Sequence, residues 1–234
     1  LHVREAGARG GLAVGGSHGA LEWNALRFIS SEGLALRANQ AAELTDLYHQ
    51  GFYPRVRALD MSDVRADTTS SALHLAAVTR TVDCERIRAR RFKLAVDAGG
   101  AAATTPALRL LEALGCDAVP VDSGAEAIPA RPEPDEASLL ALGDLVRRSG
   151  ADVGFAQDGD ADRLFVVDEH GQSLGPDATG VLVVQRWLER RAGPVVVNVS
   201  TSRMVDDVAA RFGSPVHRSR VGEAHVIEAM REHG

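Results

Sequence analysis

The stretch that organises this sequence is Ala156-Gln157-Asp158-Gly159-Asp160-Ala161-Asp162-Arg163-Leu164, in which three aspartates stand at alternate positions and an arginine follows the third. Residues 152–156 before it and the apolar run at 164–167 are predicted to be strands. Small residues between the aspartates favour a tight loop on which the carboxylates can turn toward one point. Carboxylate oxygens are ligands that Mg²⁺ and Ca²⁺ prefer. The sequence therefore predicts a metal site formed by Asp158, Asp160 and Asp162.

Two other interpretations of this loop are weaker. A solvated turn is the simplest, since Asp and Gly favour turns, but it does not explain three alternating aspartates directly after a buried strand. An EF-hand loop would place the aspartates at its first, third and fifth positions and Glu169 at its twelfth. Its sixth position needs glycine and here holds Arg163, and its flanks should be helices. A Mg²⁺ site with positions open for a phosphate fits better.

The segments before the loop alternate between strand and helix patterns. Strands are predicted at 93–97 and 118–121, and helices at 106–114 and 135–149, the last with Asp135 as its N-cap. This alternation is typical of an α/β fold with a parallel sheet. Open sheets of this kind bind ligands at the carboxyl ends of their strands, and the acidic loop follows such an end.

The same alternation extends over the whole chain and indicates successive three-layer α/β/α units with mixed, largely parallel sheets. We expect a first unit at 1–70, a connecting helix at 71–85, a second unit at 86–173 and a third at 174–234. The remaining predicted elements are strands at 11–14 and 194–199 and helices at 38–50, 176–191 and 205–212.

Composition and charge exclude several classes of protein. The 234 residues, 45% of them hydrophobic, suffice for one large domain or two ordinary ones. With 26 basic and 32 acidic residues the net charge is −6, and no basic block stands out, so nucleic-acid binding is not expected. No apolar run approaches the roughly 20 residues of a membrane span, and no signal-peptide pattern is visible.

The isolated Cys84 and Cys116 indicate free thiols in a reducing compartment, hence a cytoplasmic location.

A second motif lies near the start of the chain, at Gly15-Gly16-Ser17-His18-Gly19. It matches the nucleophile elbow of serine hydrolases, which would make Ser17 a nucleophile toward esters. An elbow should lead straight into a helix, whereas the following residues around Trp23 and Asn24 resemble another strand. A glycine-rich turn with an incidental serine is the third possibility. A serine that carries a phosphoryl group would instead pair chemically with a carboxylate-bound Mg²⁺.

Together these segments resemble, in order along the chain, the α-D-phosphohexomutases, the family of phosphoglucomutase, phosphomannomutase and phosphoglucosamine mutase. The acidic loop is similar to the family's metal loop at every ligand position. The matching segments elsewhere are Ser17-His18, Glu22 to Ala25, Arg131-Pro-Glu-Pro134, Asn198 to Ser202, and Val221-Gly222-Glu223. The segments at 22–26 and 221–223 are most similar to the archaeal-type phosphoglucosamine and phosphomannomutase branch.

The resemblance implies a role for each matching residue. Ser17 would be the phosphoserine, and a phosphoserine oxygen would join Asp158, Asp160 and Asp162 around Mg²⁺. His18 and Arg163 would hold the phosphate, since arginine suits bidentate phosphate contacts. The residues expected to contact the substrate are Val221, Gly222 and Glu223. The implied reaction interconverts hexose 1-phosphate and 6-phosphate through a bisphosphorylated sugar, with hexose 1,6-bisphosphate as activator.

Three departures from the family pattern concern the serine loop. Gly15-Gly16 replaces Thr-Ala before the serine, Gly19-Ala20 replaces Asn-Pro after it, and Arg27 stands where a lysine often acts as acid or base. Arginine does not readily release a proton near neutral pH, but it can anchor a phosphate. The family has four domains, of which this chain would hold the end of the first, the second and the start of the third. A phosphosugar partner and a monomer or homodimer are expected, and the chain is expected to be part of a longer protein.

Overall fold

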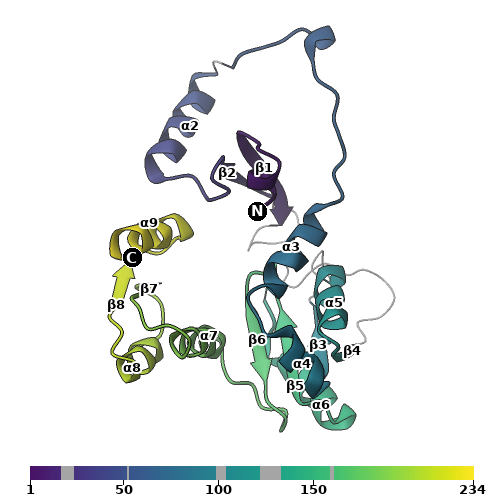
Figure 1. The fold of residues 1–234 in the computed structure, drawn as a ribbon. Coiled ribbons are helices and arrows are strands. Elements are labelled where there is room, and N and C mark those ends of the chain that lie inside the picture. The colour runs from purple at the N-terminus through teal and green to yellow at the C-terminus, as the bar shows by residue number, and fades with distance from the viewer. Residues whose placement is uncertain (17–23, 52, 99–103, 122–132, 159–160) are drawn as a thin grey trace.

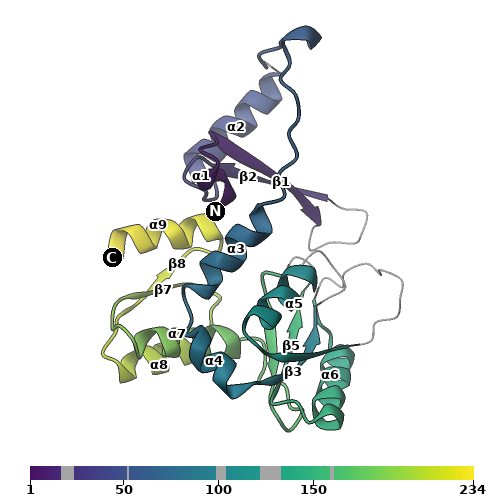
Figure 2. The same cartoon turned by 45° about the vertical axis from the view of Figure 1, so that its right-hand side comes forward.

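The computed structural model describes residues 1–16, 24–51, 53–98, 104–121, 133–158 and 161–234 (Figure 1). Three separate sheets lie in chain order, each inside one of the predicted units. The sheets of the second and third units are each covered by helices on both faces (Figures 1 and 2). This arrangement confirms the α/β class with mixed, largely parallel sheets. The exact unit boundaries stay a prediction.

The central sheet is built from β3 (Lys93–Asp97), β4 (Asp117–Pro120), β5 (Val153–Gln157) and β6 (Leu164–Val167). Its strand order is β4-β3-β5-β6, with β4, β3 and β5 parallel and β6 antiparallel to β5. The middle three residues of β3 are buried on both faces, as expected for an inner strand of a covered parallel sheet. The parallel strands end at a common edge, and the acidic loop lies there.

One face of this sheet packs against α6 (Glu136–Ser149). The cluster at this contact is fully or nearly fully buried and includes Ala95, Leu142, Val146 and Val167. The Asp135 side chain accepts a hydrogen bond of 2.8 Å from the backbone N–H of Ser138, which confirms the predicted N-cap. The helix ends at Gly150, whose left-handed backbone suits glycine. The start of α6 is therefore held firmly relative to the sheet.

The opposite face is covered by α3 (Ser70–Thr79) and α5 (Thr104–Ala113), with α4 (Cys84–Arg90) below them (Figure 2). Asp83 caps α4 by accepting a hydrogen bond from the Arg86 backbone at 3.0 Å. The basic segment at 86–91 is therefore mostly a short capped helix.

The first unit contains α1 (His2–Glu5), the antiparallel hairpin of β1 (Gly10–Gly16) and β2 (Asn24–Ser30), α2 (Ala38–Gln50) and the short 3₁₀ helix η1 (Ala58–Asp60). One face of the hairpin meets α1, where Gly11 lies against Val3. The opposite face presents large apolar side chains of which 42–70% is exposed. These are Leu12, Val14, Leu26 and Phe28. Within the described part of this unit, the hairpin therefore has only one covered face.

The third unit comprises α7 (Ala178–Leu188), β7 (Val195–Asn198), α8 (Met204–Arg211), β8 (Val216–Ser219) and α9 (Glu223–His233). Strands β7 and β8 are parallel, with α9 on one side and α7 and α8 on the other (Figure 1). An ion pair between Glu32 and Arg231 joins α9 to the turn after β2, and this pairing with Arg231 lowers the pKa of the Glu32 carboxyl.

Among the described residues, no helix has the length and apolar character that a membrane crossing requires.

We expect Gly143→Ala to destabilise the fold. A Cβ at Gly143 of α6 would lie 2.3 Å from the backbone oxygen of Gly171. Because the added carbon would meet backbone atoms and not a movable side chain, it fits only if α6 and the turn at Gly171 move apart. This movement should lower the free energy of unfolding by about 1–3 kcal/mol. Gly180 in α7 has no atom within 4 Å of the same added carbon. Gly180→Ala is the matched control and should raise the free energy of unfolding by about 0.5–1 kcal/mol. Urea denaturation of both variants measures the difference, and equal effects would contradict the close packing at Gly143.

Candidate functional site

The acidic loop connects β5 to β6 at the carboxyl edge of the central sheet. Asp158 follows β5 directly and Arg163 directly precedes β6. The backbone N–H of Asp158 donates to the Arg163 oxygen at 3.4 Å, and the Arg163 N–H donates to Asp158 Oδ1 at 3.2 Å. Ala161 lies in the left-handed region, at φ 58°, where its N–H donates to the Asp158 oxygen at 3.1 Å. The two ends of the loop are thus tied together, and its flanks are strands, which disfavours the EF-hand interpretation.

The described aspartates of the loop differ sharply in burial. The Asp158 side chain is fully buried, whereas Asp162 is exposed. Asp160 lies outside the described residues. Burying a carboxylate is costly unless hydrogen bonds or a cation compensate for it, and the Arg163 N–H and the Arg163 Nε at 4.0 Å contribute here. Within the described ranges, which omit Asp160 and Ser17, no group of three metal-ligating side chains converges. The hard oxygen donors of Asp158 and Asp162 suit Mg²⁺ in their chemistry.

Arg163 forms an ion pair with Glu133, a residue for which the sequence suggested no role. The contact joins Arg163 Nη1 to Glu133 Oε1, across 30 residues of sequence. The nearby Glu133 carboxylate is the main cause of a raised pKa of the Arg163 guanidinium. The Asp162 and Asp158 carboxylates raise this pKa further. Arg163 is therefore a fixed positive charge beside the acidic loop. The only sequence signal for Glu133 was its place in the Pro-Glu-Pro motif, which does not specify a partner.

The serine loop joins the two strands of the antiparallel hairpin, β1 and β2. Ser17 and His18 lie outside the described residues, which stop at Gly16 on β1 and resume at Asn24 on β2. Both views show the end of β1 at the hairpin tip on the same side of the central sheet as its carboxyl edge (Figures 1 and 2). Arg27 lies on β2 opposite Ala13 and is exposed. The segment after the serine loop is thus an antiparallel strand, and the helix that a nucleophile elbow requires is not found at 24–30.

The third set of predicted residues lies at the start of α9. Val221, Gly222 and Glu223 are all exposed. Gly222 has φ 124°, which L side chains rarely adopt, and its oxygen accepts hydrogen bonds from the N–H groups of His225 at 3.1 Å and Val226 at 3.2 Å. In Figure 2 the C-terminus marks one end of α9, so the helix starts at the other end, which faces α3 and the hairpin. The segment therefore lies at the end of α9 that is nearer to α3 (Figure 2).

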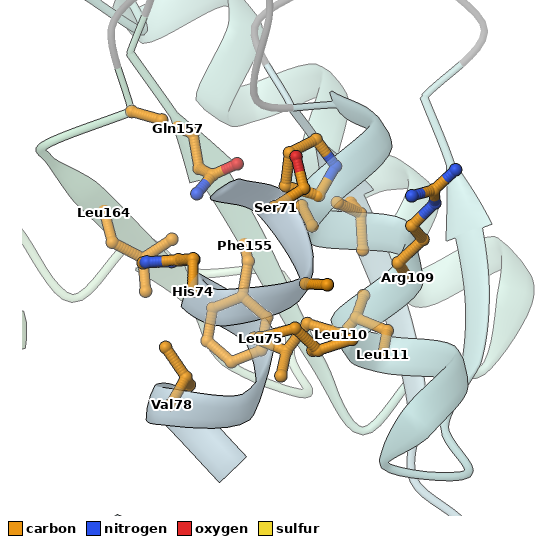
Figure 3. Close-up of a pocket in the computed structure, with 15 residues that line it drawn as sticks. Ser71, His74, Leu75, Val78, Arg109, Leu110, Leu111, Phe155, Gln157 and Leu164 are labelled. Atoms are coloured by element: carbon orange, nitrogen blue, oxygen red, sulfur yellow. The ribbon is translucent and has the colours of Figure 1, made fainter. Parts of the chain in front are cut away.

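A separate cavity of about 420 Å³ lies between α3, α5 and the face of the sheet that carries Phe155 (Figure 3). Gln157 and Ala161 bring the base of the acidic loop to its rim. Its walls are mostly apolar and include Leu75, Val78, Leu110, Leu111 and Leu164. Four polar or charged side chains within the described ranges also line it, namely Ser71, His74, Arg109 and Gln157. The cavity therefore adjoins the acidic loop, but Asp158, Asp162 and Arg163 do not line it.

The fold and the acidic loop together define a class of protein. It is an α/β protein in which a loop with carboxylates and an arginine lies at the carboxyl edge of a largely parallel sheet. Residues 72–171 match "Phosphoglucomutase/phosphomannomutase, alpha/beta/alpha domain II", and residues 175–234 match domain III of the same family. The chain belongs to this family, the α-D-phosphohexomutases. The expected family resemblance is thereby confirmed.

Two similar proteins carry names from the same family. A phosphoglucomutase/phosphomannomutase of Thermococcus kodakarensis is 33% identical over 228 residues, covering 96% of this chain and 50% of the relative. A probable phosphoglucosamine mutase of Methanopyrus kandleri is 33% identical, covering 100% of this chain and 51% of the relative. The expected similarity to archaeal phosphoglucosamine and phosphomannomutases is consistent with both. The chain spans about half the length of these relatives.

Solved structures support the same fold. A putative phosphomannomutase from Thermus thermophilus superposes with a TM-score of 0.76 at 22% identity, covering 94% of this chain and 51% of that structure. A family protein from Burkholderia thailandensis superposes with a TM-score of 0.74 at 24% identity, covering 97% and 48%. At these identities the likeness concerns the arrangement of helices and strands.

Proposed function

We propose that this chain is part of a Mg²⁺-dependent phosphohexomutase that interconverts hexose 1-phosphate and hexose 6-phosphate through a phosphoserine at Ser17. The observation that carries the proposal is the acidic loop inside the family-matched second domain, with the buried Asp158 beside Arg163. Glucosamine, mannose and glucose phosphates are the candidate substrates. The names of the archaeal relatives favour glucosamine or mannose phosphate.

The proposed roles of the residues follow from their chemistry. Asp158, Asp160, Asp162 and a phosphoserine oxygen would hold Mg²⁺, which neutralises charge on a phosphoryl group during transfer. Arg163 and His18 would bind the phosphate, and Arg27 would anchor it without exchanging protons. Val221, Gly222 and Glu223 would contact the sugar. We also propose that the unit boundaries at 70, 86 and 174 correspond to the joints between domains.

In the proposed reaction, a sugar hydroxyl oxygen attacks the phosphorus of phosphoserine 17. The bond from phosphorus to Ser17 Oγ breaks as the new bond to the sugar oxygen forms, so one phosphate ester replaces another. The proton leaves the sugar hydroxyl and the serine oxygen regains one. The bisphosphorylated sugar then reorients and returns its other phosphoryl group to Ser17. Because one ester is exchanged for another, no oxidant and no nucleotide is consumed.

The protein encoded by the complete gene, given hexose 1-phosphate, Mg²⁺ and a trace of hexose 1,6-bisphosphate, should form hexose 6-phosphate. Addition of excess EDTA should stop the reaction and added Mg²⁺ should restore it, since the loop donors are hard oxygens. A serine hydrolase would instead label at Ser17 with a fluorophosphonate in the absence of metal. Binding of metal without turnover of any of the three hexose phosphates would favour a non-catalytic metal-binding protein.

A further inference from the structure

We propose that Glu133 is a positioning residue that orients Arg163 for phosphate binding at the acidic loop, an inference that rests on the proposed function. The Glu133 carboxylate contacts Nη1 of Arg163, while the Nε of the same guanidinium lies 4.0 Å from Asp158 Oδ2. Two carboxylates on different chain segments therefore face two different nitrogens, Glu133 through a direct hydrogen bond and Asp158 at ion-pair distance. A planar guanidinium with one nitrogen bound and a second facing a buried carboxylate has a restricted orientation.

The third nitrogen of the guanidinium, Nη2, makes no hydrogen bond to any residue within the described ranges. An arginine that binds phosphate needs N–H groups that are not already used by protein acceptors. The arrangement leaves such groups available beside Asp158 and Asp162. We infer that Glu133 contributes the orientation and Arg163 the contact with the anion.

The local sequence makes Glu133 a rigid support. Pro132 precedes it and Pro134 follows it. Proline fixes its own φ and restricts the residue before it to extended backbone, so Glu133 has few alternative conformations. Asp135, two residues later, caps α6 through the backbone N–H of Ser138. The carboxylate is thus attached to a helix whose inner face is in the core.

The Glu133–Arg163 ion pair is expected to contribute little to the stability of the fold. The side chains of Arg163 and Glu133 are 48% and 52% exposed. Exposed ion pairs contribute little to folding because water and salt screen them. Removal of Glu133 should therefore leave the fold intact, and its effect should appear where the orientation of Arg163 matters.

The test compares Glu133→Ala and Glu133→Gln with the control Glu136→Gln in the protein encoded by the complete gene. Glu136 is an exposed carboxylate in the first turn of α6 and has no ion-pair partner among the described residues. We expect Glu133→Ala to lower kcat/KM for hexose phosphate by about tenfold, Glu133→Gln by less because its amide oxygen can still accept a hydrogen bond, and the control to have no effect.

A double-mutant cycle with Arg163→Ala tests whether the loss of kcat/KM in Glu133→Ala depends on the Arg163 side chain. If Glu133 acts through Arg163, Glu133→Ala should cost nothing further in that background. The ¹⁵Nη–¹H signals of Arg163 give a readout independent of activity, since the exchange of the Nη1 protons with water should accelerate in Glu133→Ala when the hydrogen bond to Glu133 is lost. A full tenfold loss in both backgrounds, or an unchanged kcat/KM and unchanged exchange in Glu133→Ala, would overturn the positioning role. Absence of mutase activity in the unmutated protein would instead overturn the proposed function, while the exchange measurement would still report on the pair.

Discussion

Asp158→Asn should lower mutase activity by at least about a hundredfold while the fold stays intact. Groups that only support metal ligands already contribute about 10–100-fold, so loss of a direct ligand should reach or exceed the upper end. Asparagine has the shape of aspartate and keeps an oxygen to accept the hydrogen bond from the Arg163 N–H, now 3.2 Å from Oδ1. The substitution therefore removes the charge and preserves the loop. Turnover at saturating Mg²⁺, together with the Mg²⁺ concentration that gives half-maximal rate, measures the effect.

The control for this substitution is Asp144→Asn. Asp144 is an exposed residue of α6, paired with Arg147 one turn along the helix. Exposed pairs of this type contribute little, so its activity and its Mg²⁺ requirement should be unchanged. If Asp158→Asn retained full activity with the same Mg²⁺ requirement, the acidic loop would not be the metal site.

Ser17→Ala should abolish turnover, with a loss of about four orders of magnitude or more. The proposed mechanism has no route around this hydroxyl, because each phosphoryl group passes through its oxygen. Ser31→Ala is the matched control, since Ser31 is an exposed serine in the turn that follows β2. Assays with hexose 1-phosphate and hexose 1,6-bisphosphate distinguish the two variants. Activity in Ser17→Ala would rule out the phosphoserine mechanism.

Much of the fold could be predicted because its signals are local. The helix expected at 38–50 is α2, Ala38–Gln50, and the strand expected at 93–97 is β3, Lys93–Asp97. The periodicity of apolar residues and the Asp135 cap depend only on neighbours in sequence. The strand character after the serine loop was also correct from Asn24 onward, and it separates this hairpin from a nucleophile elbow.

Other features depend on contacts that no local pattern encodes. The helix α4 was missed although Asp83 was a usable capping signal, because seven residues give too short a periodicity. The Glu133–Arg163 pair joins segments 30 residues apart, and its partners are chosen by the packing of α6 against the sheet. The difference in burial between Asp158 and Asp162 likewise arises from their tertiary surroundings and not from the aspartate spacing.

The sequence predicted which kinds of side chain form the candidate site, but the way in which these residues come together in space was only partly predictable. The sequence identified an oxygen-rich loop after a strand, and β5 ends immediately before Asp158. The link between that loop and Ser17 came from family resemblance, and it remains a proposal because Ser17, His18 and Asp160 lie outside the described residues. The three residues at the start of α9 are likewise proposed and not yet tested.

The most direct test of the central claim is the mass of the protein encoded by the complete gene, measured intact and after digestion, with and without hexose 1,6-bisphosphate. The account predicts one phosphoryl group, located on the peptide that contains Ser17, acquired from the bisphosphate and lost again when hexose phosphate is added. A protein that turns over hexose phosphate but never carries phosphate on Ser17 would contradict it.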